Sequence, residues 1–456
     1  MKKLLQIIIF SVWSVPLLGQ SDGEMLKRIY NEILANGQAY EQLRFLTQEI
    51  GNRLTGSPGA AAAVDWSKET MEQLGFDSVY LQEVMVPNWK RGNRANGRIL
   101  NSERFGGIEL DIIALGNTVG TGPDGVTGNI IEVKNFVDLL KIGEDKIKGN
   151  IVFFNRRMDP TSVNTFAAYG MAGDQRRAGP GEAAKFGASG VIVRSLTPNI
   201  DDHPHTGATR YLDDVPKIPA VAISTKDADR LSVLLNQEPD LKVHFQTNAQ
   251  MLGEKLSYNV IGELTGSDFP NEYIAVGGHL DSWDVGEGAH DDGAGCVQSI
   301  EVLRALKAIG YQPKRTIRAV MFMNEENGLR GGREYARMAE QNNEKHIAAM
   351  ESDRGGFTPR GFTLDMDERT LRRVQAWKSL FEPFGIYVFE PGGGGADIGP
   401  LKSQNVPLIG FKPDDQRYFK YHHTDIDTFD KVDERELHMG AATMAALIYL
   451  IDKNGL

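Results

Sequence analysis

The C-terminal half of the chain alternates between apolar strands and amphipathic helices, starting near Leu256. The predicted strands read "NEYIAVGGHL", "RTIRAVMFMN", "HIAAMES" and "VPLIGFK", and helical stretches such as "AGCVQSIEVLRALKAIG" stand between them. Strands joined by helices pair in parallel, because the crossover helix returns the chain to the same end of the sheet. The alternation therefore predicts an α/β fold in which a mostly parallel mixed sheet is sandwiched by helices.

A second pattern occupies the middle of the chain. From about Val126 to Gln250, short strands such as "GNIVFFN" and "GVIVRSL" alternate with short helices, which indicates an inserted domain. A length of 456 residues suits two or three domains. The expected order is a signal peptide at 1–20, the N-terminal part of a main domain at 21–120, the inserted domain at 121–250 and the C-terminal part of the main domain at 251–456.

The N-terminal stretch has the layout of a secretory signal peptide. Two lysines open "MKKLLQIIIFSVWSVPLLGQSDGE", an apolar run follows, and small and polar residues close it, with cleavage expected near Gly19 and Gln20. The alternative is an uncleaved membrane anchor, which the short apolar run and Pro16 disfavour. The stretch predicts a secreted or periplasmic protein with no membrane attachment after cleavage.

Net charge and cysteine usage exclude several classes of function. The chain has 50 Lys and Arg against 61 Asp and Glu, a formal net charge of -11, and no basic stripe with interleaved aromatic residues. This balance argues against a nucleic-acid partner and against binding to an anionic membrane. Cys296 is the single cysteine, so no internal disulfide forms, and its apolar helix indicates a packing residue rather than a nucleophile.

Histidine and acidic residues cluster after the predicted strands, at the edge where ligands bind in such sheets. They are His279, Asp281, Asp291, Asp292, Glu325, Glu326, Asp353, His422 and His423. Each alone has a structural explanation; Asp292, for example, precedes a helix and fits an N-cap. Together, two histidines and three separate carboxylates match the ligands of a zinc pair, whereas a structural zinc site favours cysteine.

Two adjacent acids, Glu325 and Glu326, close the strand "RTIRAVMFM". A carboxylate that binds a metal is fixed as a ligand, whereas an unbound neighbour is free to accept a proton from water and pass it to a leaving group. Adjacent residues at a strand end diverge and can serve both roles. The pattern leaves open which glutamate serves which role.

Four segments resemble the metal motifs of the M28 family of peptidases: "GGHLDSWDVGEGAHDDGAG", "MFMNEENGLRGGREYA", "ESDRGG" and "YHHTDIDTFDKVD". The segments "LTQEIGNRLTGSPGAAAAVDWSKETMEQLGFDSV" and "VPNWKRG" are similar to the carboxypeptidase Q-like (plasma glutamate carboxypeptidase-like) branch of that family. The resemblance extends over nearly the whole mature chain. The set of motifs is specific, although no single motif is.

The resemblance implies a role for each residue. It implies two Zn²⁺ ions. His279 and Asp353 would hold one ion, Glu326 and His423 would hold the other, and Asp291 would bridge both. Glu325 would be the general base for the hydroxide between the metals. Asp281 would orient the imidazole of His279 through a hydrogen bond. The family pattern also implies a cis peptide bond between Asp291 and Asp292.

Other assignments from the resemblance concern the substrate side of the site. His422 would stabilise the oxyanion of the reaction, with packing behind the ligands as an equal alternative. The loop "PGGGGADIGPL" resembles a substrate-side loop in which Gly393 and Gly394 approach the peptide and Asp397 binds its amino group; the alternative is a flexible connector.

The inserted segment resembles a protease-associated (PA-like) domain, which would cover the cleft and shape substrate access. Two histidines in it, His203 and His205 of "DDHPHTG", are candidates for extra metal ligands. A loop that faces solvent or the rim of the cleft is the stronger interpretation.

The resemblance implies a secreted dinuclear zinc exopeptidase that hydrolyses dipeptides or short peptides with free termini, as carboxypeptidases and dipeptidases do. An aminopeptidase with the same metals is one alternative. A glutaminyl cyclase, with its single zinc, and an inactive receptor-like binding protein are others, and the complete ligand set argues against both. The expected partner is a peptide substrate; relatives often form homodimers, although no sequence feature indicates one here.

Overall fold

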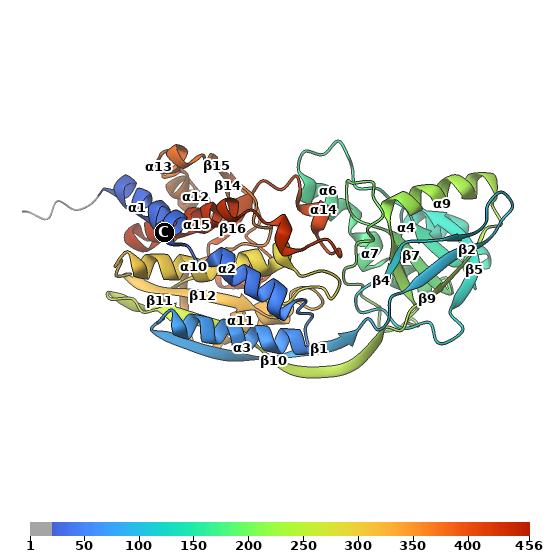
Figure 1. Cartoon of the computed structure of the whole chain (residues 1–456), viewed down its shortest axis with the longest axis horizontal. Coiled ribbons are helices and arrows are strands. Elements are labelled where there is room, and N and C mark those ends of the chain that lie inside the picture. The colour runs from blue at the N-terminus through green and yellow to red at the C-terminus, as the bar shows by residue number, and fades with distance from the viewer. Residues whose placement is uncertain (1–20) are drawn as a thin grey trace, which may run out of the picture.

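The computed structural model describes residues 21–456 and contains two eight-stranded sheets in separate parts of the molecule (Figure 1). The signal peptide predicted at 1–20 lies outside the described residues. The strand order of the main sheet is β1 (Ser78–Lys90), β10 (Gln250–Leu264), β12 (Arg315–Phe322), β11 (Phe269–His279), β13 (Lys345–Glu351), β16 (Leu408–Pro413), β14 (Pro359–Asp365) and β15 (Val388–Pro391). The second sheet has the order β3 (Gly106–Glu109), β2 (Asn96–Ser102), β9 (Lys242–Gln246), β5 (Val126–Val133), β6 (Ile151–Phe154), β7 (Gly190–Arg194), β8 (Ala220–Ile223) and β4 (Ile112–Ala114).

The main sheet has a parallel centre with antiparallel strands on both sides. Strands β12, β11, β13 and β16 pair in parallel, while β10 and β14 run antiparallel to β12 and β16. The predicted mostly parallel mixed sheet is therefore confirmed. Because the central strands run in one direction, their carboxyl ends meet at one edge of the sheet.

Helices cover both faces of the main sheet. The helices of the main part are α1 (Asp22–Asn36), α2 (Ala39–Arg44), η1 (Phe45–Ile50), α3 (Pro58–Gln73), η2 (Ala289–Gly293), α10 (Ala294–Ala308), α11 (Arg330–Gln341), α12 (Glu368–Gln375), α13 (Lys378–Phe381), η3 (Glu382–Phe384), η4 (Gly399–Gln404), α14 (Tyr418–Tyr421), η5 (Phe429–Lys431) and α15 (Glu434–Asn454). Ile274 and Val276 of β11 pack with α1, α3, α10 and α15, whereas Ala275 packs with α11 and η4 on the opposite face. Alternate residues of a strand point to opposite faces, so the sheet is buried on both sides.

Local sequence signals set the starts of several helices. Ser21 and Glu24 form a capping box at α1, in which each side chain accepts a hydrogen bond from the other residue's backbone N–H. Ser57 caps α3, and Pro58 occupies its first turn, where its missing N–H costs nothing. Asp433 caps α15 through the backbone N–H of Glu436. Sequence and structure therefore agree on where these helices begin.

The second sheet is also covered on both faces. Its helices are α4 (Phe136–Ile142), α5 (Glu144–Ile147), α6 (Thr165–Ala172), α7 (Asp174–Arg177), α8 (Gly179–Ala184) and α9 (Thr225–Gln237). Ile151 and Phe153 of β6 pack with α9, whereas Val152 and Phe154 pack with α4 and α8. The sheet includes β2, β3 and β4, which precede residue 121, the expected start of the insert. These strands belong here because β2 and β4 hydrogen bond to β9 and β8.

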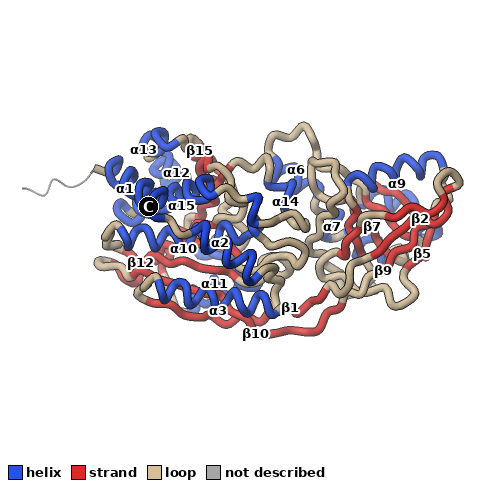
Figure 2. Tube along the Cα trace, in the orientation of Figure 1, coloured by secondary structure: helices blue, strands red, loops and turns tan. Residues whose placement is uncertain are grey.

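The two parts of the molecule are joined by a strand pair and by packed aromatic residues. Strands β1 and β10 run together from the main sheet toward the second one (Figure 1). Helices α6 and α14 lie between the sheets (Figure 2), where the ring of Phe166 stacks on that of Tyr418 with centroids 5.2 Å apart. Within residues 21–456, no helix combines the length and the apolar character that crossing a bilayer requires.

A buried polar network lies under α11. Arg318 is 3% exposed and pairs with Glu263 and Glu344 at 2.8 and 2.7 Å. Its guanidinium donates to the hydroxyl of Tyr335, which lies 2.7 Å from Nε2 of His346. Burial, aided by the charge of Arg318, lowers the pKa of His346 to about 4. The folded protein therefore keeps this imidazole neutral.

We expect His346 to make the folded state sensitive to acid. Between pH 6.5 and about 4, the unfolded chain binds a proton at this residue and the folded chain does not. The contribution of His346 to the free energy of unfolding is therefore fully present above pH 6.5 and is lost as the pH falls toward about 4. The loss reaches about 3 kcal/mol. The measurement is the free energy of unfolding in denaturant, determined for wild type and His346→Gln at several pH values. The loss is the part of its pH dependence that only wild type shows. Parallel pH profiles of the two proteins would contradict this role.

Candidate active site

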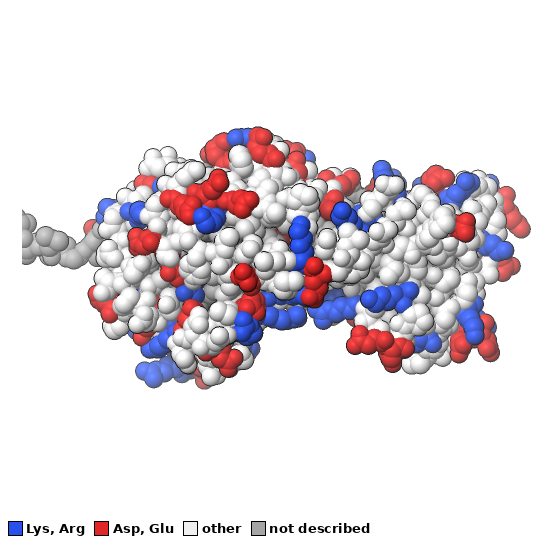
Figure 3. Space-filling view, turned by 90° about the horizontal axis from the view of Figure 1, so that it is seen from below, with Lys and Arg blue, Asp and Glu red and all other residues white. Residues whose placement is uncertain are grey.

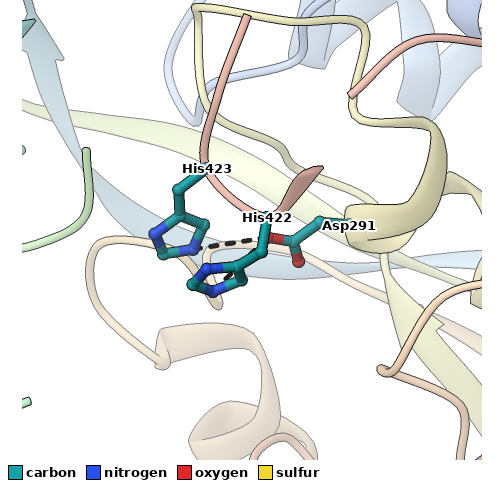
Figure 4. Close-up of side chains that lie close together, drawn as sticks. All are labelled: Asp291, His422 and His423. Carbon is teal, nitrogen blue, oxygen red and sulfur yellow. Dashed lines mark ion pairs between the residues drawn. The ribbon is translucent and has the colours of Figure 1, made fainter. Parts of the chain in front are cut away.

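The predicted site residues converge at the carboxyl edge of the main sheet. His279 ends β11, Glu326 follows β12 and Asp353 follows β13, so three neighbouring strands deliver them. Asp291 comes from η2 at the start of α10, and His423 from the turn after α14. Figure 4 shows Asp291 beside His422 and His423. The structure therefore brings together side chains that are up to 144 residues apart in the sequence (423 minus 279).

The two carboxylate oxygens of Asp291 face two different groups of side chains. Its Oδ1 lies 3.3 Å from Nε2 of His279, which is 3.6 Å from Oδ1 of Asp353. Its Oδ2 lies 3.3 Å from Nε2 of His423, which is 3.0 Å from Oε2 of Glu326. The five residues therefore form two trios of donor atoms that share Asp291.

The two trios fit divalent cations. Ligands about 2.0–2.1 Å from a tetrahedral zinc ion lie roughly 3.3 Å from each other, close to the separations in both trios. Oδ2 of Asp291 and Oε1 of Glu326 are buried and have no hydrogen-bond partner among the described residues. Because unpaired buried charge is costly, divalent cations would stabilise this cluster of carboxylates.

Backbone contacts orient the histidines. Nδ1 of His279 lies 2.8 Å from the carbonyl oxygen of Asp281, and Nδ1 of His423 lies 3.1 Å from that of Thr206. Each Nδ1 donates to its carbonyl, which leaves the lone pair of Nε2 to face the carboxylates. Both imidazoles are therefore held in the tautomer that binds a metal.

Asp281 has a different partner from the one that the resemblance implied. Its carboxylate lies 3.9 Å from Nδ1 of His279, while Oδ1 accepts hydrogen bonds from the backbone N–H groups of Asn324 and Glu325 at 2.7 and 3.0 Å. Oδ2 accepts from the N–H of Glu326 at 3.3 Å. These N–H groups follow the end of β12 and lack a sheet partner, so the carboxylate turns to them. Asp281 thus positions the turn that carries both glutamates.

Glu325 lies at the pocket beside the two trios and belongs to neither. Burial, reinforced by the neighbouring Asp353 charge against the opposing effect of His279, raises the pKa of Glu325 to about 8. A carboxylate with a raised pKa can accept a proton and release it again near neutral pH. Of the two adjacent glutamates, Glu325 is therefore the one that lies outside both trios, and Glu326 is the one that belongs to the second trio.

Asp292 and Cys296 have structural surroundings. The carboxylate of Asp292 accepts the backbone N–H groups of His279 and Gly295 at 3.0 and 3.1 Å, which ties the start of α10 to β11. A Cβ on Gly295 would lie 1.9 Å from the carbonyl oxygen of Ser352, so only glycine permits this approach. Cys296 is buried, and burial raises the pKa of its thiol. The peptide bond between Asp291 and Asp292 is cis, as predicted.

His422 stacks on His423 with ring centroids 3.5 Å apart, and its Nε2 lies 3.8 Å from Oδ2 of Asp291. Burial lowers the pKa of His422 to about 3, so the ring is neutral. Oε2 of Glu326 lies 3.0 Å from Nε2 of His423, a shorter distance than the 3.8 Å between His422 and Asp291. Glu326 therefore completes the second trio without His422. His422 instead lines the pocket.

The glycine-rich loop does not reach the pocket that surrounds these residues. Gly393, Gly394 and Asp397 are absent from its lining within residues 21–456, and Asp397 is fully buried. The carboxylate of Glu351 accepts the loop's N–H groups from Ala396 and Ile398 at 2.7 and 2.8 Å. The loop therefore packs closely against the end of β13.

The sequence did not reveal that the second part of the molecule supports a ligand of the site. The backbone N–H of Thr206 donates to the carbonyl of His423 at 3.0 Å, and Nη1 of Arg176 donates to the carbonyl of Thr206 at 3.0 Å. The same Nη1 lies 3.4 Å from Nδ1 of His423. His205, expected in a loop that faces solvent or the rim of the cleft, is buried, because this loop docks against the main part. His203 pairs with Asp425 at 2.8 Å.

Arg176→Lys is expected to weaken zinc binding by about 10-fold. Loss of a partner that orients a metal ligand typically costs 10- to 100-fold in affinity, and a lysine cannot reproduce the guanidinium's hold on the Thr206 carbonyl, which accepts from Nδ1 of His423. Zinc affinity is measured by competition with a chelator. Arg104→Lys, at an exposed position between β2 and β3, is the control, and equal zinc affinity in both variants would contradict the role of Arg176.

A pocket of about 410 Å³ opens in front of the trios. Its walls come from both parts of the molecule: the lining comprises Asn117, Phe166, Tyr169, Arg176, Arg177, Ala208, Arg210, Asp291, Glu325, Glu326, Asn327, Gly328, Leu329, Arg333, Asp353, Tyr418, Phe419, His422 and His423. A volume of this size accommodates a small ligand such as a short peptide.

The fold and the site define the chain as a metallopeptidase. The sequence pattern described as "Peptidase family M28" matches residues 259–448. Carboxypeptidase Q from Bos taurus and that from Homo sapiens are each 32% identical, over 94% of this chain and 89% of theirs. The chain therefore belongs to peptidase family M28, and its similarity to carboxypeptidase Q confirms the resemblance seen in its motifs.

Solved structures agree with this assignment. A peptidase M28 precursor from Shewanella amazonensis superimposes with a TM-score of 0.90 at 33% identity, and the match covers 94% of this chain and 96% of that one. A zinc aminopeptidase from Bacillus subtilis has a TM-score of 0.64 at 20% identity, with 91% and 94% covered, which is a likeness of fold.

Proposed function

We propose that this metallopeptidase is a secreted exopeptidase that holds two zinc ions and hydrolyses dipeptides or short peptides with free termini. The observation that carries the proposal is the shared carboxylate of Asp291, with one oxygen in each trio. His279 and Asp353 would hold one ion, Glu326 and His423 the other, and Asp291 both. When bound, zinc supplies Lewis acidity to a peptide carbonyl and to water.

Residues of the chain would move the proton. Glu325 accepts a proton from the attacking water and delivers it to the departing amine, for which its place at the pocket beside the trios is suited. Asp281 holds the backbone of Glu325 by a hydrogen bond of 3.0 Å, which fixes the direction of that carboxylate. His422 is neutral and lines the pocket, where an N–H would stabilise the developing oxyanion.

We propose that the second sheet and its helices form a PA-like module that shapes access to the site. Phe166, Tyr169 and Arg176 line the pocket from this side, which supports the assignment. The proposed module is the expected insert at 121–250, extended by β2, β3 and β4. The parts at 21–120 and 251–456, without those strands, form the peptidase domain. The N-terminal sequence "MKKLLQIIIFSVW" supports export, with cleavage just before α1.

An aminopeptidase is the second candidate function. A probable lipoprotein aminopeptidase from Mycobacterium tuberculosis is 27% identical over 62% of this chain, and the Bacillus subtilis enzyme shares the fold. The two candidates differ in which free terminus the substrate needs. An inactive binding protein is disfavoured, because every ligand of both trios is present.

Metal analysis combined with a peptide panel tests the proposal. We expect about two zinc ions per chain and cleavage of free dipeptides. Cleavage of N-acetylated peptides with a free carboxyl terminus supports the carboxypeptidase, whereas activity restricted to peptides with a free amino terminus supports the aminopeptidase. A folded protein that binds no zinc and cleaves none of these peptides contradicts both.

A further inference from the structure

The pocket is lined by both acidic residues and arginines. Asp291, Glu325, Glu326 and Asp353 line it from the carboxyl edge of the main sheet. Arginines line it elsewhere, from α7, from the loop after Thr209 and from α11. In Figure 3, Lys and Arg side chains also gather where the two parts of the molecule meet on the face shown. A local positive surface on a chain with a net charge of -11 points to an anionic group in the ligand.

Three of the pocket arginines are exposed and have no acidic partner. Among residues 21–456, no carboxylate lies within 4.0 Å of the guanidinium nitrogens of Arg177, Arg210 or Arg333. By contrast, Arg91 and Arg318, which lie elsewhere, pair with acids at 2.6–2.8 Å. A guanidinium without a partner keeps its forked donors available for a carboxylate.

The three arginines come from both sides of the pocket. The backbone N–H of Arg210 donates to the carbonyl of Arg177 at 2.8 Å, so these two residues are neighbours on the second part. Arg333 belongs to the main part, where its Nη1 donates to the carbonyl of Gly328, three residues after Glu325. Arg176 differs from them, because it is buried and its guanidinium already contacts Thr206 and His423.

We propose that Arg177, Arg210 and Arg333 form a carboxylate-binding rim that receives the C-terminal carboxylate of the peptide substrate. This inference rests on the proposed function and extends it, because it names the residues that select a free carboxyl terminus. Two bound zinc ions would offset the charges of the four pocket carboxylates, so the arginines are the positive groups that stay available for a carboxylate of the peptide. Guanidinium groups bind carboxylates through two parallel hydrogen bonds, which also fixes the direction of the peptide.

The rim predicts that a free carboxyl terminus is recognised. A peptide amide has the same shape at its end but lacks the charge, so it loses charge-assisted hydrogen bonds to the rim. Such bonds correspond to about 10- to 100-fold in affinity. An acidic side chain is another source of a carboxylate, and a peptide with a C-terminal amide and a glutamate side chain distinguishes the two sources.

Equilibrium binding to the zinc-loaded Glu325→Gln protein tests the rim without turnover. Calorimetry compares Ala-Leu, Ala-Leu amide and Ala-Glu amide. We expect Ala-Leu to bind at least about 10-fold more tightly than either amide. Adding Arg177→Gln, Arg210→Gln or Arg333→Gln reduces this preference, and the triple variant removes it. Arg104→Gln, exposed between β2 and β3, is the matched control and leaves the preference unchanged.

Several results would overturn the rim: equal binding of Ala-Leu and its amide, a preference that survives in the triple variant, or no binding of any peptide. Tight binding of Ala-Glu amide would assign the rim to acidic side chains and overturn the C-terminal assignment. If wild type cleaves no peptide while arginine-dependent binding of Ala-Leu is present, the proposed function fails and the rim stands. In active wild type, the arginine variants raise KM for free acids more than they lower kcat.

Discussion

Glu325→Gln is expected to retain its zinc and lose peptide hydrolysis by roughly 10²- to 10⁴-fold in kcat. Glu325 lines the pocket outside both trios, so its replacement by an amide of equal size leaves the donor atoms of His279, Asp291, Glu326, Asp353 and His423 in place. A glutamine cannot accept a proton from water or return one to an amine. Zinc content and kcat, measured on the same preparation, separate the two effects.

The controls for this experiment come from the same region. Glu340→Gln removes an exposed carboxylate from α11 and is expected to have wild-type activity. Glu325→Asp keeps the proton acceptor but withdraws it by one methylene, so it should fall between wild type and Glu325→Gln. Activity near wild type in Glu325→Gln would remove Glu325 from the role of base. Loss of zinc in that variant would instead make it a ligand.

The fold of the main part was predictable because its signals are local. The strands of the parallel centre are short apolar runs, and β11 and β12 are each followed by an amphipathic stretch with helical spacing, whereas β13 is followed by strand β14. The rule that ligands bind at the carboxyl ends of such strands then selects His279, Glu326 and Asp353 from many acidic and histidine residues. The strands β2 and β4 are different: they are short, and their partners β9 and β8 lie more than 100 residues away in the sequence.

The details of the site depend on contacts that no local pattern carries. The family resemblance implied that Asp281 orients the imidazole of His279, two residues away, whereas its carboxylate accepts from the N–H groups of Asn324 and Glu325. The contact between Thr206 and His423 joins residues 217 positions apart. A sequence shows which groups can bind a metal, but it does not show which backbone groups lack a partner until the chain is folded.

The glycine-rich loop shows that a glycine can have more than one reason. The resemblance of Gly392 to Gly395 to a substrate-side loop implied close approach of a substrate. Gly395 has φ of 153°, and a Cβ there would lie 2.3 Å from the carboxylate carbon of Glu351. Gly395 therefore makes its close approach to a buried side chain of the protein, whereas among the described residues nothing lies within 4 Å of a Cβ built on Gly393, and the assignment of Gly393 and Gly394 to the substrate stays a prediction. Glycine thus reports the need for space and not the identity of what fills it.

Asp291→Asn should have the largest effect on metal binding, and it should differ in stoichiometry from Glu326→Gln. Each oxygen of Asp291 belongs to a different trio, so the neutral amide weakens both sites and leaves at most one good donor. Glu326 belongs to the second trio alone. We expect Glu326→Gln to hold about one zinc ion per chain and Asp291→Asn to hold fewer, with hydrolysis reduced by about 10³-fold or more in Asp291→Asn.

Thermal unfolding provides a second readout of the same difference. A ligand that binds only the folded state stabilises it by RT ln(1 + [L]/Kd), so zinc should raise the unfolding temperature of wild type most, of Glu326→Gln less and of Asp291→Asn least. Asp268→Asn, in an exposed turn before β11, should respond to zinc as wild type does. Two zinc ions in Asp291→Asn, or one ion in wild type, would show that the two trios do not form a pair of sites joined by this carboxylate. The order of the three responses therefore tests the arrangement on which the proposed function rests.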